Sequence, residues 1–265
     1  MALAAIPFGL AIGVAVGMLG GGGSVLAVPV LVYVLGQSVQ EATTASLVIV
    51  TAGAVAGGLG HAREGRICWR HAAAFTAAAF PGVAAGTALG NAVSGSALIA
   101  AFAIIMLAAA PATWRKASGR GDDRPAEPAR APSCPPLRLA RDLAAGLTIG
   151  VMTGFFGVGG GFLIVPTLAI FLALSMRLAV GTSLAIITAS SLLGLAAHLL
   201  AGRGLDIPIT ATMTAACVVG ALAGATLAGR VPQRQLGRGF AALVAAIATY
   251  LLISAAFLGG PPGSS

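Results

Sequence analysis

The chain has 265 residues, of which 58% are hydrophobic and only 8% are charged, and its mean hydropathy is +0.98. Soluble domains carry about 25% charged residues, so this composition excludes a soluble enzyme or binding module and indicates an integral membrane protein. The net charge of +8 does not point to a nucleic-acid partner, because the basic residues lie in short loops between apolar segments, as the positive-inside rule expects.

Ten apolar segments follow one another along the chain, five in each half. They cover residues 3–19, 25–36, 44–61, 72–90 and 97–114, and then 142–157, 162–174, 181–201, 208–228 and 239–258. The second segment of each half is short of the roughly 20 residues that a spanning helix needs. We therefore predict that the first two segments of each half form a hairpin, either re-entrant or fully spanning, and that the other three are spanning helices. The first apolar run lacks a basic start, so we expect a structural segment rather than a removed signal peptide.

The two halves are copies of one unit. Shifting the sequence by 137 residues aligns residues 9–66 with 146–203 without a gap, and 25 of these 58 positions are identical. The identities include Pro29 with Pro166 and His61 with His198, which a shared bias toward Ala, Gly and Leu does not explain. Duplication of this kind is typical of secondary transporters. We expect a first repeat over 1–114, a flexible linker over 115–139 that is rich in Pro, Arg, Asp and Ala, and a second repeat over 140–265.

The basic residues predict how the chain crosses the membrane. A hairpin plus three spans per repeat places the loops at 62–71, 115–141, 175–180 and 229–238 on one side, and these loops hold 14 of the 15 Lys and Arg residues. That side is then the cytoplasm. The prediction is an all-α polytopic protein of the plasma or inner membrane with two inverted-topology repeats, both termini outside and the linker 115–139 in the cytoplasm.

A glycine-rich turn recurs in the two repeats and is the first candidate for a binding site. The first copy comprises Gly20, Gly21, Gly22, Gly23 and Ser24 with Pro29, and the second comprises Gly157, Gly159, Gly160 and Gly161 with Pro166. Such turns can present main-chain N–H groups and the positive end of a helix dipole to an anion. The alternative is that the glycines only allow helices to pack closely. For the clusters we favour the binding site, with Pro29 and Pro166 in a structural role.

The pattern Gly-x-x-Gly-x-Gly-Gly-Gly-x-x-x-x-Pro-x-Leu at Gly154 to Leu168 resembles the signature of the sulfite exporter TauE/SafE family. The first copy follows it at Gly17, Gly20, Gly22, Gly23, Pro29 and Leu31, with Ser24 in place of the last glycine, and the segments Ala45-Ser46-Leu47 and Gly181-Thr182-Ser183-Leu184 add to the likeness. The resemblance covers nearly the whole chain apart from the linker. It implies a membrane permease for small anions, typically sulfite, sulfonates or other organosulfur compounds, and it leaves the substrate open.

Hydroxyl side chains open the third segment of each repeat. Those nearest the glycine turns are Thr44, Ser46, Thr182 and Ser183, and Ser46 and Ser183 are equivalent positions of the repeat. They can donate hydrogen bonds to an oxyanion, so we include them in the candidate site. The alternative is that each hydroxyl bonds a nearby backbone carbonyl of its own helix.

Few other residues offer chemistry. The equivalent histidines His61 and His198 are candidate proton relays, although the topology places them near opposite membrane surfaces, where wetted, hydrogen-bonded side chains are expected. All seven acidic residues fall in loops or at segment ends, which argues against a cation substrate. The three cysteines are odd in number and lack metal-ligand spacing, so the sequence predicts neither a disulfide framework nor a metal site.

These observations together predict a transporter of small anions, and not an enzyme, that works by alternating access as one half rocks against the other. We expect no cofactor and no nucleic-acid partner. The partners we expect are a small anion and the lipid bilayer, and a homo-oligomer is left open. Two alternatives stay open as well: a channel for an anion or small solute, and a membrane subunit of a larger complex.

Overall fold

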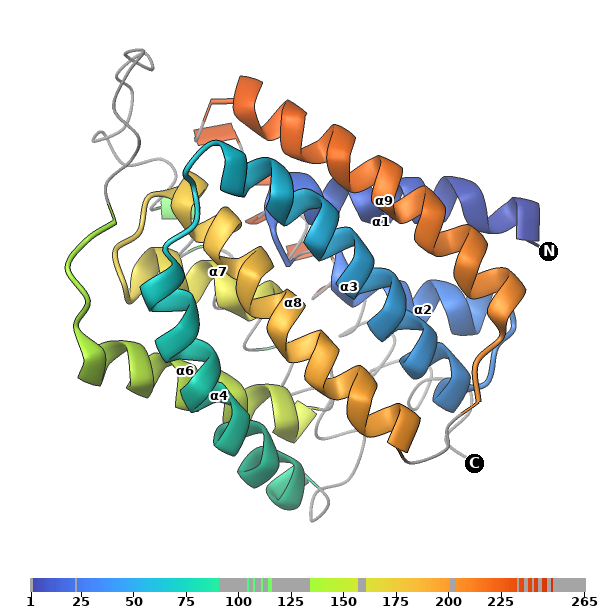
Figure 1. The fold of residues 1–265 in the computed structure, drawn as a ribbon, viewed down its shortest axis with the longest axis horizontal. Coiled ribbons are helices and arrows are strands. Elements are labelled where there is room, and N and C mark those ends of the chain that lie inside the picture. Colours follow the sequence, from blue (N-terminus) through green and yellow to red (C-terminus); the bar gives the residue numbers. More distant parts are fainter. Residues whose placement is uncertain are drawn as a thin grey trace.

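The chain folds into helices throughout the part that the structure describes. This computed structural model describes residues 2–21, 23–90, 134–156, 161–200 and 204–232, with single positions between 104 and 115 and between 234 and 249. The elements, drawn in Figure 1, are α1 (Ala2–Leu19), α2 (Ser24–Pro29), the π-helical turn η1 (Val30–Val34), α3 (Val39–Arg63), α4 (Trp69–Gly90), α6 (Leu139–Phe156), α7 (Gly161–Ile170), α8 (Met176–Leu200) and α9 (Ile207–Arg230). The predicted segments 97–114 and 239–258, and the linker up to residue 133, lie largely or wholly outside the described residues.

Among the described helices, three are long and apolar enough to cross a membrane, namely α3, α8 and α9. This finding confirms the membrane-protein class. The second apolar segment of each half is short, as predicted: α7 has 10 residues and α2 with η1 has 6 and 5. At 1.5 Å per residue, α7 extends about 15 Å, roughly half the thickness of a bilayer's hydrocarbon core.

Two helix starts follow directly from the local sequence. At α3, the Ser38 hydroxyl accepts from the Glu41 backbone N–H and the Glu41 carboxylate accepts from the Ser38 backbone N–H, both at 3.3 Å. This reciprocal pair satisfies two donors that a helix start leaves without partners. At α9, the Asp206 carboxylate accepts from the Ile209 N–H at 3.2 Å.

Helices α3 and α8 run antiparallel and lie side by side across the middle of the molecule (Figure 1). Near one end of the pair the missing side chain of Gly57 would face Leu184, and near the other the missing side chain of Gly194 would face Leu47. Gly57 and Gly194 are separated by 137 residues, as are Leu47 and Leu184. In both contacts, a glycine of one half meets a leucine of the other half.

Glycines bring two further helix pairs into backbone contact, α1 with α9 and α4 with α6 (Figure 1). A Cβ atom on Gly13 of α1 would overlap the Cys217 carbonyl of α9, and one on Gly150 of α6 would overlap the Ala79 carbonyl of α4. From the opposite helix of each pair, a Cβ atom on Gly220 of α9 would overlap a carbonyl of α1, and one on Gly82 of α4 would overlap a carbonyl of α6. Small residues let backbones approach this closely, which is how helices associate in a membrane. In each pair, one helix comes from each half of the sequence.

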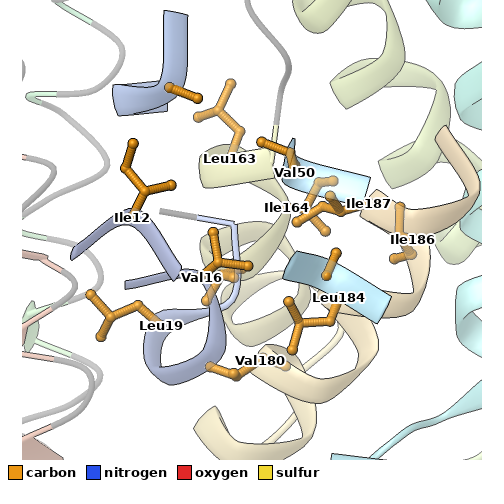
Figure 2. Packing of buried hydrophobic residues seen from close by; sticks show 14 of the residues in the cluster. Ile12, Val16, Leu19, Val50, Leu163, Ile164, Val180, Leu184, Ile186 and Ile187 are labelled. Carbon is orange, nitrogen blue, oxygen red and sulfur yellow. The ribbon is translucent and has the colours of Figure 1, made fainter. Parts of the chain in front are cut away.

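Apolar side chains from α1, α3, α7 and α8 pack together in one buried cluster. In Figure 2, side chains from α1, α7 and α8 converge on one another together with Val50 of α3, and the labelled residues are Ile12, Val16, Leu19, Val50, Leu163, Ile164, Val180, Leu184, Ile186 and Ile187. Val16 and Leu184 are fully buried. Because lipid is as apolar as these side chains, their stabilising contribution within a bilayer comes from close packing rather than from removal of water.

In the part of the chain that the structure describes, residues in or next to the basic loops lie close together at one end of the molecule. The carbonyl of Arg66 would overlap a Cβ atom on Gly181 near the start of α8, and the place of a Cβ on Gly229 near the end of α9 lies 3.6 Å from the Arg66 guanidinium. Residue 134, at the end of the predicted linker, reaches the same place through a disulfide bond to Cys68.

That disulfide corrects the sequence-based expectation of no disulfide framework. Cys68 and Cys134 are 66 residues apart in sequence, and their Cα atoms are 5.8 Å apart. An odd number of cysteines excludes a fully paired set but not one pair, and the packing of α6 against α4 brings these two together. Cys217 is the free cysteine among the described residues, buried in α9.

We predict that Gly150→Val separates α4 from α6, because the new Cβ atom would overlap the Ala79 carbonyl. The expected loss is about 3 kcal/mol, the upper end of the usual cost of overpacking, and it would appear as a lower unfolding temperature of the detergent-solubilised protein. Gly204→Val is the matched control, because nothing lies within 4 Å of its Cβ position. An unchanged unfolding temperature for Gly150→Val would contradict the packing described above.

Candidate functional site

The first glycine turn begins where α1 ends. The Gly20 N–H donates to the Val16 carbonyl at 2.9 Å, and Gly20 adopts a φ of +77°. A side chain is strained in this left-handed conformation, so the position favours glycine. A Cβ atom on Gly20 would also lie 2.5 Å from the Ser183 hydroxyl oxygen of α8. The turn is therefore held against the second half of the chain.

Gly21 of the first predicted glycine turn contacts Gly161, the last residue of the second predicted turn. A Cβ atom on Gly21 would overlap the carbonyl of Gly161, the first residue of α7, and both glycines are buried. The structure thus brings Gly20, Gly21, Gly161 and Ser183 together from the two halves. Gly22, Gly157, Gly159 and Gly160 were also predicted to belong to the site, but they lie outside the described residues.

The other described residues of the first turn lie beside the hairpin that α1 and α2 form. Gly23 packs against α1, the other arm of the same hairpin, because a Cβ atom added to Gly23 would lie 2.6 Å from the Ile12 carbonyl oxygen. Ser24 begins α2, and Pro29 ends it where the backbone changes to the π-helical turn. Pro166 lies inside α7.

The four candidate hydroxyls are all buried, and all have partners. Ser183 donates to the Val180 carbonyl at 2.7 Å and Ser46 donates to the Thr43 carbonyl at 2.8 Å, each three residues back along its helix. The Thr182 hydroxyl oxygen accepts the Cys68 backbone N–H at 3.0 Å, and the Thr44 hydroxyl lies 3.1 Å from His198 Nδ1. To bind an anion, Ser183 would have to rotate its hydroxyl hydrogen away from Val180, since a hydroxyl has one hydrogen to donate.

The two equivalent histidines differ in their surroundings. His61 is only 1% exposed and donates from Nε2 to the Gly17 carbonyl at 3.1 Å. The prediction that water would reach this side chain is therefore wrong. Its Nδ1 atom is buried and has no hydrogen-bond partner among the described residues. The equivalent atom of His198 contacts Thr44, and the residue of the second half that corresponds to Thr44 is Gly181. Glycine has no hydroxyl, which accounts for the difference.

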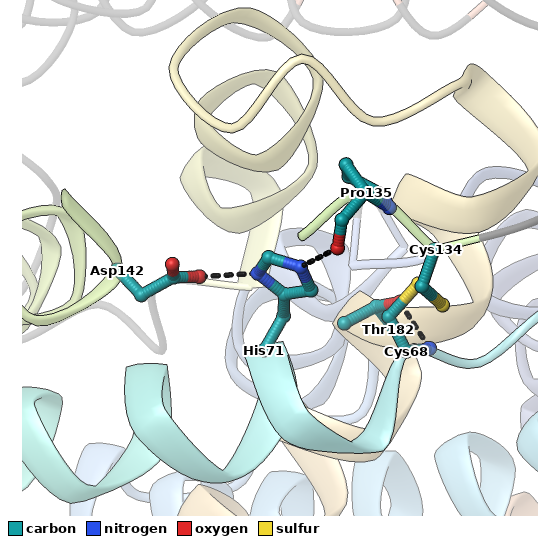
Figure 3. The surroundings of a disulfide bond; sticks show 6 residues. All are labelled: Cys68, His71, Cys134, Pro135, Asp142 and Thr182. Atoms are coloured by element: carbon teal, nitrogen blue, oxygen red, sulfur yellow. Dashed lines mark hydrogen bonds and ion pairs between the residues drawn. A yellow bond between two sulfur atoms is a disulfide. The ribbon is translucent and has the colours of Figure 1, made fainter. Parts of the chain in front are cut away.

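A second polar cluster was not predicted from the sequence. His71, near the start of α4, places Nδ1 2.5 Å from the Asp142 carboxylate of α6 and Nε2 3.1 Å from the Pro135 carbonyl (Figure 3). Both side chains are almost fully buried, at 3% and 1% exposed. Each ring nitrogen of His71 therefore has an oxygen partner, the Asp142 carboxylate at Nδ1 and a backbone carbonyl at Nε2.

Sequence reasoning missed this pair for a physical reason. His71 and Asp142 each lie at the edge of an apolar segment, where charged residues are usually solvated, and no local spacing relates them. The available signal was the place of Asp142 in the first turn of a segment that is otherwise apolar.

Comparisons with known proteins agree with this architecture. Residues 5–251 match the family model described as sulfite exporter TauE/SafE. The chain belongs to this family. It is 33% identical over 248 residues to a "Probable membrane transporter protein" of Xylella fastidiosa (strain 9a5c), and 32% identical over the same length to its counterpart in strain Temecula1, with 91% of each chain covered in both cases. It is also 24% identical over 214 residues to "Probable membrane transporter protein YunE" of Bacillus subtilis (strain 168), with 75% of this chain and 78% of that protein covered. No solved structure matches it significantly.

Membership of the family identifies the chain as a multi-pass membrane transporter and not an enzyme. The described residues contain no group of three His, Cys, Asp or Glu side chains that could hold a metal ion. Around Gly20, Gly21 and Gly161, the described part of the chain offers main-chain groups and the Ser183 hydroxyl.

We predict that Asp142→Ala destabilises this transporter by on the order of 3 kcal/mol, because it removes one partner of a buried ion pair. Asp142→Asn should cost less, since the amide N–H₂ can donate to Nδ1 of a neutral His71 whose Nε2 still donates to Pro135. Thermal unfolding in detergent would measure both. Asp206→Ala provides the control, with an expected loss of about 1 kcal/mol for a helix cap. Equal losses for the three variants would contradict the buried pair.

Proposed function

We propose that this transporter exports a small sulfur oxyanion, such as sulfite or a sulfonate, by alternating access. The observation that carries the proposal is the meeting of the two glycine turns at Gly21 and Gly161, beside Ser183. The substrate class follows from the description of the family model as a sulfite exporter. The relatives' names say only that they are membrane transporters.

The binding site we propose lies where the turns meet. Main-chain N–H groups of residues 20–24 and 157–161 would surround the anion once the Gly20 N–H leaves the Val16 carbonyl, and the hydroxyls would add donors. The full set is Gly20, Gly21, Gly22, Gly23, Ser24, Gly157, Gly159, Gly160, Gly161, Thr44, Ser46, Thr182 and Ser183. Closely approaching backbones suit this role, because glycine allows an N–H group to reach a ligand that a side chain would keep away. Ser183 is the hydroxyl with direct support, since it lies against Gly20.

An inverted repeat is the arrangement we propose for the two halves. It is supported by contacts that recur with the offset of the repeat: Gly57 faces Leu184 as Gly194 faces Leu47, and Gly13 faces α9 as Gly150 faces α4. Because α1 packs on α9 and α6 packs on α4, each of these pairs contains one helix from each half. The bodies that rock around the turns would then be these mixed pairs rather than the two sequence halves.

The end of the molecule where the basic loops meet is, in this proposal, the cytoplasmic end. The four loops assigned to that side hold 14 of the 15 Lys and Arg residues, and charge of this sign is retained in the cytoplasm. The linker 115–139 would lie there, and both termini outside. A channel lined by the same turns, or a membrane subunit of a larger complex, are the competing proposals. A saturable flux that exchanges counter-substrate would argue against a channel.

The test is sulfite flux into proteoliposomes. We expect Gly20→Ala to abolish saturable flux, because the new methyl group would meet the Ser183 hydroxyl. Gly36→Ala is a matched control: Gly36 also has a positive φ, +68°, so its substitution carries the same backbone strain of about 1–2 kcal/mol, but nothing lies within 4 Å of its Cβ position. Equal flux through both variants would refute the site.

Ser183→Ala tests the hydroxyl in the same assay. We expect a rise in KM of about tenfold, the effect of losing one hydrogen bond of roughly 1.4 kcal/mol to a charged ligand. Ser190→Ala is the control, because Ser190 lies on the same helix, is exposed, and makes the same type of bond, to the Ile187 carbonyl at 3.1 Å. An unchanged KM for Ser183→Ala would remove this hydroxyl from the site.

His61 is the better of the two candidate proton relays, with His198 as the other. The His61 Nδ1 atom can take up a proton without breaking a bond within the described structure, whereas the same atom of His198 contacts Thr44. We expect His61→Gln to abolish flux driven by a pH gradient while leaving sulfite counterflow at equal pH intact, and His198→Gln to retain both. Gradient-driven flux in His61→Gln at the wild-type rate would exclude the relay.

A further inference from the structure

The disulfide between Cys68 and Cys134 lies at the end of the molecule where the basic loops meet. Cys68 precedes α4 and is 2% exposed, whereas Cys134 is exposed. The bond joins the loop between α3 and α4 to the last residues before α6 (Figure 3). One sulfur atom therefore belongs to a residue that solutes can reach, and the other belongs to the protein interior.

A second contact reinforces the same connection. One helical turn after Cys68, His71 donates to the carbonyl of Pro135, the residue that follows Cys134, and pairs with Asp142 (Figure 3). The segment 134–142 is thus fastened by one covalent bond to the residue before α4 and by two polar contacts to α4 itself. Breaking the disulfide would leave the two polar contacts of His71 in place, and contacts of this kind can open reversibly.

The disulfide is also connected to α8. The backbone N–H of Cys68 donates to the buried hydroxyl oxygen of Thr182, at 3.0 Å, and the Arg66 carbonyl lies where a side chain of Gly181 would be. Thr182 is adjacent to Ser183, which lies against the first glycine turn. The order of contacts therefore runs from the disulfide through α8 to the proposed site.

The compartment makes this bond unusual. With the sidedness of the proposed function, both cysteines lie in the cytoplasm, where thiols are kept reduced and the disulfides that do form are usually transient or redox-sensing. Two cysteines within bonding distance in such a compartment can serve as a redox-sensing pair.

We propose that Cys68 and Cys134 form a reversible redox site that, when oxidised, fastens residues 134–138 to the loop before α4 and restrains the start of α8. The oxidant is a small-molecule disulfide. One cysteine thiolate attacks it, forms a mixed disulfide and expels one thiolate; the second cysteine thiolate then attacks the protein sulfur and expels the other. Two protein thiols are oxidised and the small-molecule disulfide is reduced to two thiols. The two protons released by the protein thiols are taken up by the two small thiolates. A protein dithiol reverses the reaction by the same exchange.

The first test reads the thiol state of the full chain in cells. Acid quenching, alkylation of free thiols, reduction and a second alkylation by a heavier reagent report which cysteines were paired. We expect Cys68 and Cys134 to be free in unstressed cells and paired after treatment with a disulfide-forming oxidant. Complete pairing in unstressed cells would mark a permanent structural bond and overturn the proposal, as would no pairing after oxidation.

The second test measures amide hydrogen exchange of the purified protein in detergent, oxidised and reduced. Reduction should speed exchange roughly fivefold, the lower end of coupling between two sites, in peptides covering 64–71 and 176–184. Cys134→Ser should match the reduced wild type in both conditions, and Cys217→Ser, whose cysteine lies in α9 away from the bond, should respond as the wild type does. Equal exchange in both states would overturn the restraint. Neither readout needs a transported anion, so a failure of the redox proposal can be distinguished from a failure of the sulfite proposal.

Discussion

This structure depends on close contact between helix backbones at glycine positions, where no side chain separates them. Gly13 of α1 and Gly150 of α6 each leave room only for a carbonyl of the opposing helix, and Gly21 does the same for Gly161 where the two glycine turns meet. In a bilayer, helices gain little from burying apolar surface and associate through close packing. The same absence of side chains that fastens the helices also brings the first glycine turn into contact with Gly161 at the start of α7. Close packing and anion binding are therefore compatible interpretations of these glycines. Gly23 packs against α1, whereas Gly20 and Gly21 border the proposed site.

The two halves of the chain are alike in sequence but not in their polar contacts. Thr44 gives His198 a partner, whereas Gly181 leaves Nδ1 of His61 without one among the described residues. The disulfide and the ion pair between His71 and Asp142 likewise occur at one end of the molecule. The position of the second half that corresponds to Cys68, 137 residues later, holds Leu205 and not a cysteine. An alternating-access transporter needs two states that differ in energy and response, and departures from the repeat are where that difference can arise.

The family and the geometry contribute different parts of the functional conclusion. Membership of the sulfite exporter TauE/SafE family makes the chain a membrane transporter. The geometry narrows the proposal to one region: the end of α1, the start of α7 and the first third of α8. It also separates the hydroxyls by role, because Thr182 is engaged with the loop that carries the disulfide, whereas Ser183 lies beside the glycine turn.

The sequence by itself determined the all-helical membrane class, the family, and the short second segment of each half, because hydropathy, segment length and glycine spacing are local properties. It located α3 and α8 to within a few residues for the same reason. The tertiary structure alone decided which elements meet. Cys68 with Cys134, His71 with Asp142, and Gly20 with Ser183 are separated by 66, 71 and 163 residues. No periodicity links such positions, since their contact depends on how α4 packs against α6 and how the first turn packs against α8.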